Sequence, residues 1–174
     1  MPRTMSVSDS TMVAVAPSAV YAQVSDPTAM GRWSPENRGA KVLGERREAY
    51  VGMVFEGRNK RGRLSWTTRC TVTAADLGER FAFRVHAIGA RRPRLPGAIA
   101  TWEYRFEEVD GATLVTETWT DDRRGWPDFL ANAFDRAATR GHTFADFQRG
   151  NIRTTLQRLK AALEAPLDGD APRA

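Results

Sequence analysis

Two residues of this sequence, Glu117 and Tyr104, have the types and positions needed for acid–base chemistry. Asp110-Gly111 lies between two segments rich in strand-forming residues. This dipeptide is a strong hairpin signal, because both positions of a type I′ turn need positive φ. A two-residue loop here places Tyr104 opposite Glu117 on one face, since side chains alternate between faces along a strand. We therefore take Glu117 and Tyr104 as the candidate catalytic pair.

The face that carries Glu117 is otherwise apolar and is the predicted inner face of the sheet. Its other members on this hairpin are Trp102, Phe106, Val115 and Trp119. Burying an unpaired carboxylate is costly, so Glu117 is expected to be hydrogen-bonded, wetted by a cavity, or protonated. Two interpretations stay open: a functional carboxyl group with a raised pKa, or a structural carboxylate tied to Tyr104, Trp66 or Asn59.

The neighbouring strands supply further candidates for the inner face. A hairpin with its loop at 76–79 gives the inward pairs Ala74–Phe81, Val72–Phe83, Cys70–Val85 and Thr68–Ala87. Trp33 and Glu36 precede the second strand, where Trp33 either gates a cavity mouth or seals the core edge. Asn59 either contacts a polar ligand group or caps a strand end, and the aromatic residues either stack on a planar ligand or pack the core. The candidate ligand-binding residues are Trp33, Glu36, Phe55, Asn59, Trp66, Cys70, Phe83, Trp102, Phe106, Trp119 and Phe144.

The elements that hold these residues follow from side-chain pattern and from glycine and proline. Strands are predicted at 6–16, 40–48, 53–59, 64–75, 80–87, 98–109 and 112–120, because these segments are rich in β-branched and aromatic residues and are separated by glycine-containing turns. Two short helices, at 18–25 and 28–33, follow the first strand and end near prolines.

The C-terminal third changes to helical periodicity. Its apolar stripe consists of Leu130, Phe134, Ala137, Gly141, Phe144, Ile152, Leu156, Leu159 and Leu163. Gly141 and Gly150 each weaken a helix by about 1 kcal/mol relative to alanine, and Thr143 followed by Asp146 is a restart signal. We therefore predict a long but kinked or interrupted helix. The fold class is α+β: a seven-stranded curved antiparallel sheet wrapped around this helix, an arrangement that tends to leave a hollow.

Several short segments are typical of one superfamily. They are Val24-Ser25-Asp26-Pro27, Gly31-Arg32-Trp33-Ser34-Pro35-Glu36, Phe55-Glu56-Gly57-Arg58-Asn59, Trp102-Glu103-Tyr104, Thr116-Glu117-Thr118-Trp119 and 155–160. Together with the order of elements, they resemble the START-related, Bet v 1-like helix-grip superfamily (SRPBCC), in its bacterial polyketide cyclase/dehydrase-like branch. The resemblance covers 7–163. It implies the helix-grip fold and leaves the reaction open, because the superfamily includes lipid carriers, hormone binders and cyclases.

Three hypotheses for function follow. The first is a protein that binds a hydrophobic, aromatic or lipid-like small molecule in an internal cavity. The second is an enzyme resembling polyketide cyclases and aromatases, in which Glu117 and Tyr104 move protons while Asn59 or Glu36 orients the substrate. The third is a nucleic-acid or membrane-surface protein that acts through basic loops at one end of the sheet.

Composition limits these choices. The chain has 174 residues, a net charge of +5 and one cysteine, which excludes an intrachain disulfide. It contains no run of about 20 apolar residues that could cross a bilayer and no signal-peptide pattern, so we expect a cytoplasmic protein. One domain at 6–164 and a disordered tail at 165–174 are predicted. No cofactor is expected, and no Cys/His spacing predicts a metal site.

The positive charges concentrate in three predicted loops. They are Arg58, Lys60, Arg61, Arg63, Arg91, Arg92, Arg94, Arg123 and Arg124. Because strands in a meander alternate direction, these loops are expected to lie at one end of the sheet. They either attract an acidic partner or are simply solvated, and the excess charge is too mild to predict DNA binding. The sequence does not predict an oligomeric state.

Overall fold

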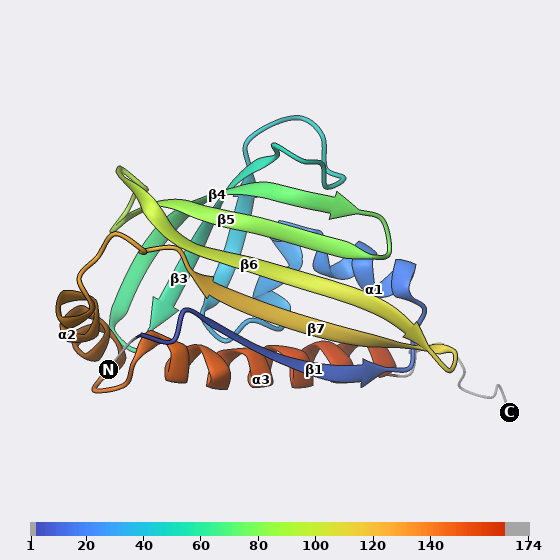
Figure 1. The fold of residues 1–174 in the computed structure, drawn as a ribbon. Helices are drawn as coiled ribbons and strands as arrows, with labels where there is room; N and C mark the ends of the chain where they lie inside the picture. Colours follow the sequence, from blue (N-terminus) through green and yellow to red (C-terminus); the bar gives the residue numbers. More distant parts are fainter. Residues whose placement is uncertain (1–2, 166–174) are drawn as a thin grey trace, which may run out of the picture.

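The computed structural model describes residues 3–165 and shows one curved sheet of seven antiparallel strands lying over a long helix (Figure 1). The strand order is β1-β7-β6-β5-β4-β3-β2. The strands are β1 (Ser6–Val13), β2 (Asn37–Val42), β3 (Val54–Arg61), β4 (Leu64–Asp76), β5 (Arg80–Gly89), β6 (Leu95–Val109) and β7 (Ala112–Asp121). The helices are α1 (Pro17–Val24), the 3-10 helix η1 (Pro27–Arg32), α2 (Asp128–Thr139) and α3 (Phe144–Glu164). The predicted fold class is confirmed; the predicted tail lies outside the described residues from residue 166 onward.

The β6–β7 hairpin has the predicted register. Its two-residue loop consists of Asp110 with φ 51° and Gly111 with φ 80°. Tyr104 lies directly opposite Glu117. Local turn chemistry therefore sets the pairing that brings the two candidate catalytic residues together.

The β4–β5 hairpin matches the prediction only in its middle. The confirmed pairs are Val72–Phe83 and Cys70–Val85. The end pairs were predicted wrongly, because Phe81 lies opposite Ala75 and Ala87 lies opposite Arg69. The register shifts by one residue on each side of the confirmed pairs, and such bulges interrupt the alternation on which the prediction rested.

Strand β2 also differs from its predicted range of 40–48. It begins at Asn37, and its register shifts between Asn37 and Ala40. Gly39 lies in this irregular part with φ 115°, a conformation that L residues rarely adopt. The chain thus enters the sheet earlier than alternation predicts, through a bulge that depends on glycine.

The C-terminal helical segment is interrupted at one of the two predicted glycines. Helix α2 ends at Thr139, and Arg140 (φ 60°) and Gly141 (φ 104°) turn the chain. Thr143 caps α3 by accepting a hydrogen bond from the backbone N of Asp146 at 3.2 Å. Helix α3 then continues through Gly150 without a break.

The predicted apolar stripe faces the sheet along α3 but not along α2. Ile152, Leu156 and Leu159 are buried on α3, which lies beside β1 and β7 (Figure 1). Leu130 and Phe134 are each 50% exposed, so their predicted core position is wrong. The turn after α2 changes the direction of the chain, and the stripe on α2 no longer meets the sheet.

Candidate functional site

Glu117 and Tyr104 form a buried pair on the inner face of the sheet. The Tyr104 hydroxyl donates a hydrogen bond to Oε1 of Glu117 at 2.8 Å. Glu117 is 2% exposed, and its second carboxyl oxygen, Oε2, is buried without a hydrogen-bond partner among the described residues. A buried carboxyl oxygen without a hydrogen-bond partner lowers the stability of the fold. Protonation of the oxygen or a hydrogen bond to a ligand would reduce this cost.

Burial controls the protonation of this pair. It raises the pKa of Glu117 to about 8, although the hydrogen bond from Tyr104 opposes the shift. Burial also raises the pKa of Tyr104, and the adjacent carboxyl group adds to that increase. Glu117 is therefore mostly protonated at neutral pH, so its carboxyl group can donate a hydrogen bond or a proton.

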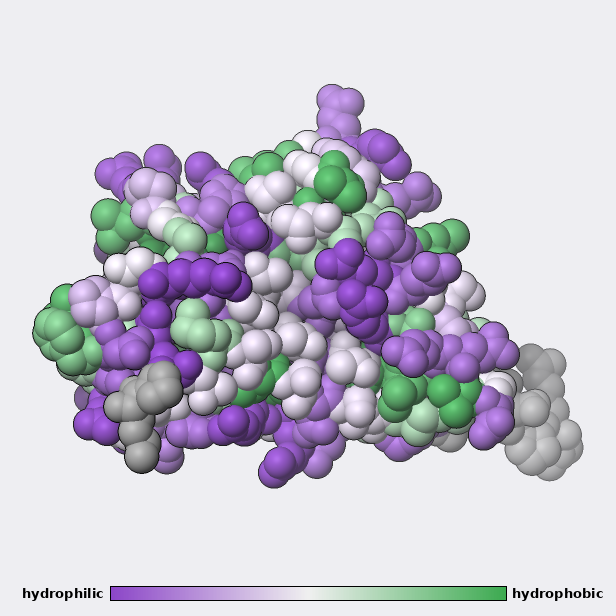
Figure 2. Space-filling model, in the orientation of Figure 1, coloured by the Kyte–Doolittle hydropathy of each residue, from purple (hydrophilic) through white to green (hydrophobic). Residues whose placement is uncertain are grey.

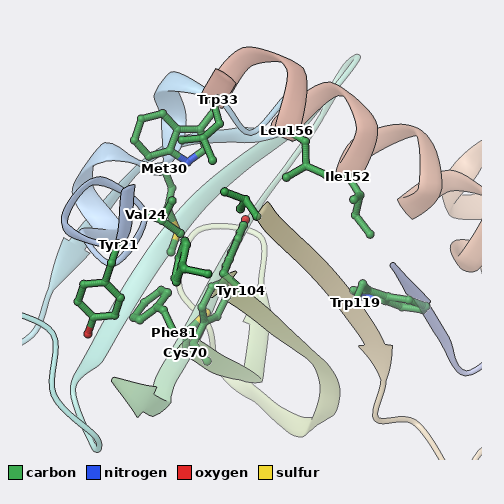
Figure 3. Close-up of a cluster of buried hydrophobic side chains, with 14 of the residues drawn as sticks. Tyr21, Val24, Met30, Trp33, Cys70, Phe81, Tyr104, Trp119, Ile152 and Leu156 are labelled. Carbon is green, nitrogen blue, oxygen red and sulfur yellow. The ribbon is translucent and has the colours of Figure 1, made fainter. Parts of the chain in front are cut away.

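The pair belongs to a wall of mostly apolar buried side chains on the inner side of the sheet. Figure 3 shows Tyr104 between the sheet and the helices, with Leu156 on α3. The rings of Phe55 and Phe83 pack edge to face with centroids 5.2 Å apart. Among the candidate ligand-binding residues, the buried ones are Trp33, Phe55, Cys70, Phe83, Phe106 and Trp119. Those only partly buried are Glu36, Asn59, Trp66, Trp102 and Phe144.

Cys70 lies on this wall as a protonated thiol. Burial raises the pKa of its thiol to about 12, and only a weak contact with Thr68 opposes that shift. We therefore expect native Cys70 to react with iodoacetamide at least about 100-fold more slowly than the unfolded protein, because alkylation requires an accessible thiolate. Mass spectrometry of alkylated protein with and without denaturant measures this ratio, and equal rates would show that the wall opens readily.

A polar cluster joins the start of β2 to the helices. Arg61 Nε lies 2.5 Å from Oε1 of Glu36, and Nδ2 of Asn151 donates to Oε2 of Glu36 at 3.1 Å. Arg61 also donates to the carbonyl of Ala138 at 2.9 Å and lies 3.9 Å from the ring centroid of Phe147. Sequence reasoning placed Glu36 near a cavity mouth but missed Arg61 as its partner, because the two residues are 25 positions apart.

Asn59 and Trp66 lie at a different place from the buried acid. They belong to a surface hollow of about 370 Å³, and Glu117 and Tyr104 are not among its lining residues. Its lining is Arg38, Arg58, Asn59, Lys60, Ser65, Trp66, Thr67, Ala90 and Arg91. Of the three structural partners proposed for Glu117, Tyr104 is the one that forms its hydrogen bond.

The predicted ring of nine basic loop residues needs correction. Arg123 is buried, and its guanidinium holds Asp121 through two bonds of 2.8 and 2.9 Å and Asp135 through a third of 2.8 Å. Burial alone would raise the pKa of Asp121, but the hydrogen bonds from Arg123 lower it below its usual value. Arg61 is likewise held by Glu36. These two arginines anchor structural elements and are not free to meet an acidic partner.

Two further findings concern other kinds of site. Within residues 3–165, no group of three or more His, Cys, Asp or Glu side chains is placed to hold a metal ion. In the same part of the chain, no helix is long and apolar enough to cross a membrane.

Solved structures define the class of protein. The chain is 27% identical to the Polyketide_cyc-like protein Cgl2372 from Corynebacterium glutamicum, over 100% of both chains and with a TM-score of 0.61. It is 12% identical to a START superfamily protein from Mycobacterium smegmatis (92% and 98% covered, TM-score 0.66) and 10% identical to Ara h 8.0201 (91% and 96% covered, TM-score 0.54), likenesses that show the fold alone. The protein has the helix-grip fold of the START/Bet v 1 superfamily.

The sequence itself shows the family. Residues 4–164 match the family model described as "Polyketide cyclase / dehydrase and lipid transport". The chain belongs to this family, as its resemblance to the cyclase/dehydrase-like branch implied. Among curated proteins, none matches this sequence.

Proposed function

We propose that this protein binds a hydrophobic small molecule, aromatic or lipid-like, between the sheet and α3. The observation that carries the proposal is the buried carboxyl oxygen of Glu117 that has no partner among the described residues. The buried side chains packed between the sheet and the helices are mostly apolar, so Glu117 offers a hydrogen-bonding group in surroundings suited to an apolar molecule. The ligand expected from this arrangement has an apolar body and a single carbonyl or hydroxyl oxygen.

The protonated form of Glu117 acts as the anchor in this proposal. Tyr104 donates to Oε1 and thereby orients the carboxyl group, which leaves the O–H on Oε2 to donate to a ligand carbonyl. Entry of the ligand requires side chains to move, because Glu117 is buried and lines neither the hollow beside Trp66 nor the one beside Trp126.

A cyclase-like enzyme is the second candidate, because a carboxyl group with a pKa near 8 can also protonate a carbonyl oxygen during aldol closure and dehydration. The variant Glu117→Gln separates the two functions. Its amide can still accept from Tyr104 and donate to a carbonyl, but it cannot transfer a proton. A binding protein keeps its affinity in this variant, whereas an enzyme keeps binding and loses turnover.

The binding proposal can be tested with a fluorescent naphthyl ketone and the same naphthalene without its carbonyl group. We expect wild-type affinity for the ketone to fall as the pH rises through about 8, because the ionised carboxylate cannot donate. Glu117→Gln is expected to remove this pH dependence, and Glu117→Leu to weaken ketone binding about three- to tenfold, the loss of one neutral hydrogen bond. The hydrocarbon is the control and should bind equally to all three proteins.

Two results would contradict the proposal. One is a ketone affinity that is identical in the wild type and in Glu117→Leu, which would mean that the carboxyl group does not contact the ligand. The other is the failure of both probes to bind, combined with native mass spectrometry that finds no co-purified apolar molecule. That combination would show a closed interior and a purely structural role for the pair formed by Glu117 and Tyr104.

A further inference from the structure

Helix α2 exposes its apolar face and buries its small and polar one. Its buried residues are Ala131, Asp135 and Thr139, which follow each other at spacings of four. Its large apolar side chains face outward: Phe129 is 72% exposed, and Leu130 and Phe134 are 50% exposed. A surface helix normally has the opposite arrangement, because burial of its apolar stripe stabilises it.

The outward apolar residues form one continuous surface with the loop before the helix. We define the α2 patch as Trp126, Phe129, Leu130 and Phe134. The rings of Trp126 and Phe134 pack edge to face with centroids 5.7 Å apart. Gly125, Trp126, Pro127, Leu130 and Phe134 line a shallow hollow of about 450 Å³. Figure 2 shows hydrophobic surface gathered at the end of the molecule where Figure 1 labels α2.

This clustering distinguishes the α2 patch from ordinary exposed apolar residues. The other large apolar side chains that are exposed are Met12, Leu43, Val51, Leu64, Leu77, Leu95 and Val109. They are spread over three strands, β1, β4 and β6, and over the two connections that follow β2 and β4. Scattered exposed residues of this kind are normal on a protein surface. Four aromatic or leucine side chains within nine positions instead mark an interaction surface.

The charges around the α2 patch indicate the chemistry of its partner. Arg124, Arg136 and Arg140 are exposed, and none of them forms an ion pair within residues 3–165. The nearby carboxylates are already engaged, since Asp135 binds Arg123 and Asp128 lies 3.5 Å from Arg3. The rim of the patch is therefore positive.

We propose that the α2 patch docks on an anionic lipid surface. The helix lies at one end of the molecule and outside the sheet, so its apolar side chains can enter the headgroup–acyl boundary without unfolding the domain (Figure 1). Tryptophan and phenylalanine suit this boundary, and the three unpaired arginines meet the lipid phosphates. A groove on another protein could also accept the apolar side chains of the patch. An anionic lipid surface explains the positive rim as well, because it offers negative charge all around the inserted side chains.

Flotation with lipid vesicles tests this proposal. We expect the full chain to bind vesicles that contain roughly one third phosphatidylglycerol, to bind pure phosphatidylcholine about tenfold more weakly, and to lose affinity as salt rises. The double variant Phe129→Ser/Leu130→Ser is expected to lose at least about tenfold in affinity. Leu77→Ser is the matched control, because Leu77 is 76% exposed at the β4–β5 turn, far from α2 (Figure 1).

The charge contribution is tested separately. Arg124→Gln/Arg140→Gln is expected to bind both kinds of vesicle equally, whereas Arg158→Gln on the exposed side of α3 should behave as the wild type. Circular dichroism of each variant verifies that it is folded.

The proposal is overturned if the wild type binds neither vesicle or if Phe129→Ser/Leu130→Ser binds as well as Leu77→Ser. It is also overturned if the wild type is a dimer that this double variant dissociates without any change in vesicle binding, because the patch would then be a subunit interface.

Discussion

Replacing Arg123 with methionine is expected to lower the free energy of unfolding by about 3–5 kcal/mol, the usual effect of removing one partner from a buried ion pair. Asp121 and Asp135 have side chains that are each 2% exposed, and Arg123 binds both. In the variant, Asp135 loses its ion-pair partner, and Asp121 keeps only the more distant Arg3. Because Asp121 ends β7 and Asp135 lies on α2, the attachment of α2 to the sheet is expected to loosen as well.

Urea denaturation of matched variants measures this effect. Arg149→Met is the control, because Arg149 and Asp146 form an ion pair on α3 in which both side chains are more than half exposed. Such pairs contribute at most about 1 kcal/mol. Adding Asp135→Asn to Arg123→Met should recover part of the loss, since it removes one unpaired buried charge. A loss below about 1 kcal/mol for Arg123→Met would show that water reaches this ion network and compensates for the missing partner.

The second large effect is a dependence of stability on pH that originates at Glu117. Its pKa is about 8 in the folded protein and near the ordinary 4.5 in the unfolded chain. The folded state therefore binds more protons between these values, so the free energy of unfolding decreases as the pH rises from about 5 to about 8. The slope is at most about 1.4 kcal/mol per pH unit, which gives roughly 4 kcal/mol over the whole window.

Comparison with Glu117→Gln isolates this contribution. Other titrating groups are present in both proteins, so the difference between their unfolding free energies at each pH reports on Glu117 alone. We expect the wild type to lose stability relative to Glu117→Gln as the pH rises, with no further relative change above about pH 9. Glu108→Gln, at an exposed position of β6, should show no such difference from the wild type. Parallel curves for the wild type and Glu117→Gln would mean that Glu117 ionises normally in the folded protein.

The sequence predicts the surroundings of Glu117 better than those of Arg123. The position of Glu117 opposite Tyr104 could be predicted because a two-residue turn and strict side-chain alternation are local rules. The same rules failed at the ends of the β4–β5 hairpin and at the start of β2, where bulges shift the register. A bulge depends on how neighbouring strands twist and pack, which the alternation of side chains does not record.

The apolar stripe of the C-terminal region shows the same limit. Its spacing predicts helices, and the structure contains them on both sides of Gly141. Spacing also predicts that the stripe is buried, which holds for Ile152 and Leu156 but not for Leu130 and Phe134. Periodicity states which residues share a face of a helix, whereas the direction of the chain after a turn decides what that face meets.

The sequence by itself determined the order of strands and helices, the α+β class, the inner face of the central hairpin and the family. These features depend on turn residues and on side-chain periods, which act over a few positions of the chain. Only the tertiary structure decided that Arg123 joins Asp121 to Asp135, that Arg61 meets Glu36, and that α2 turns its aromatic side outward. Those arrangements depend on the angle at which the chain enters α2 and on contacts between distant segments, such as Asn151 with Glu36 across 115 positions.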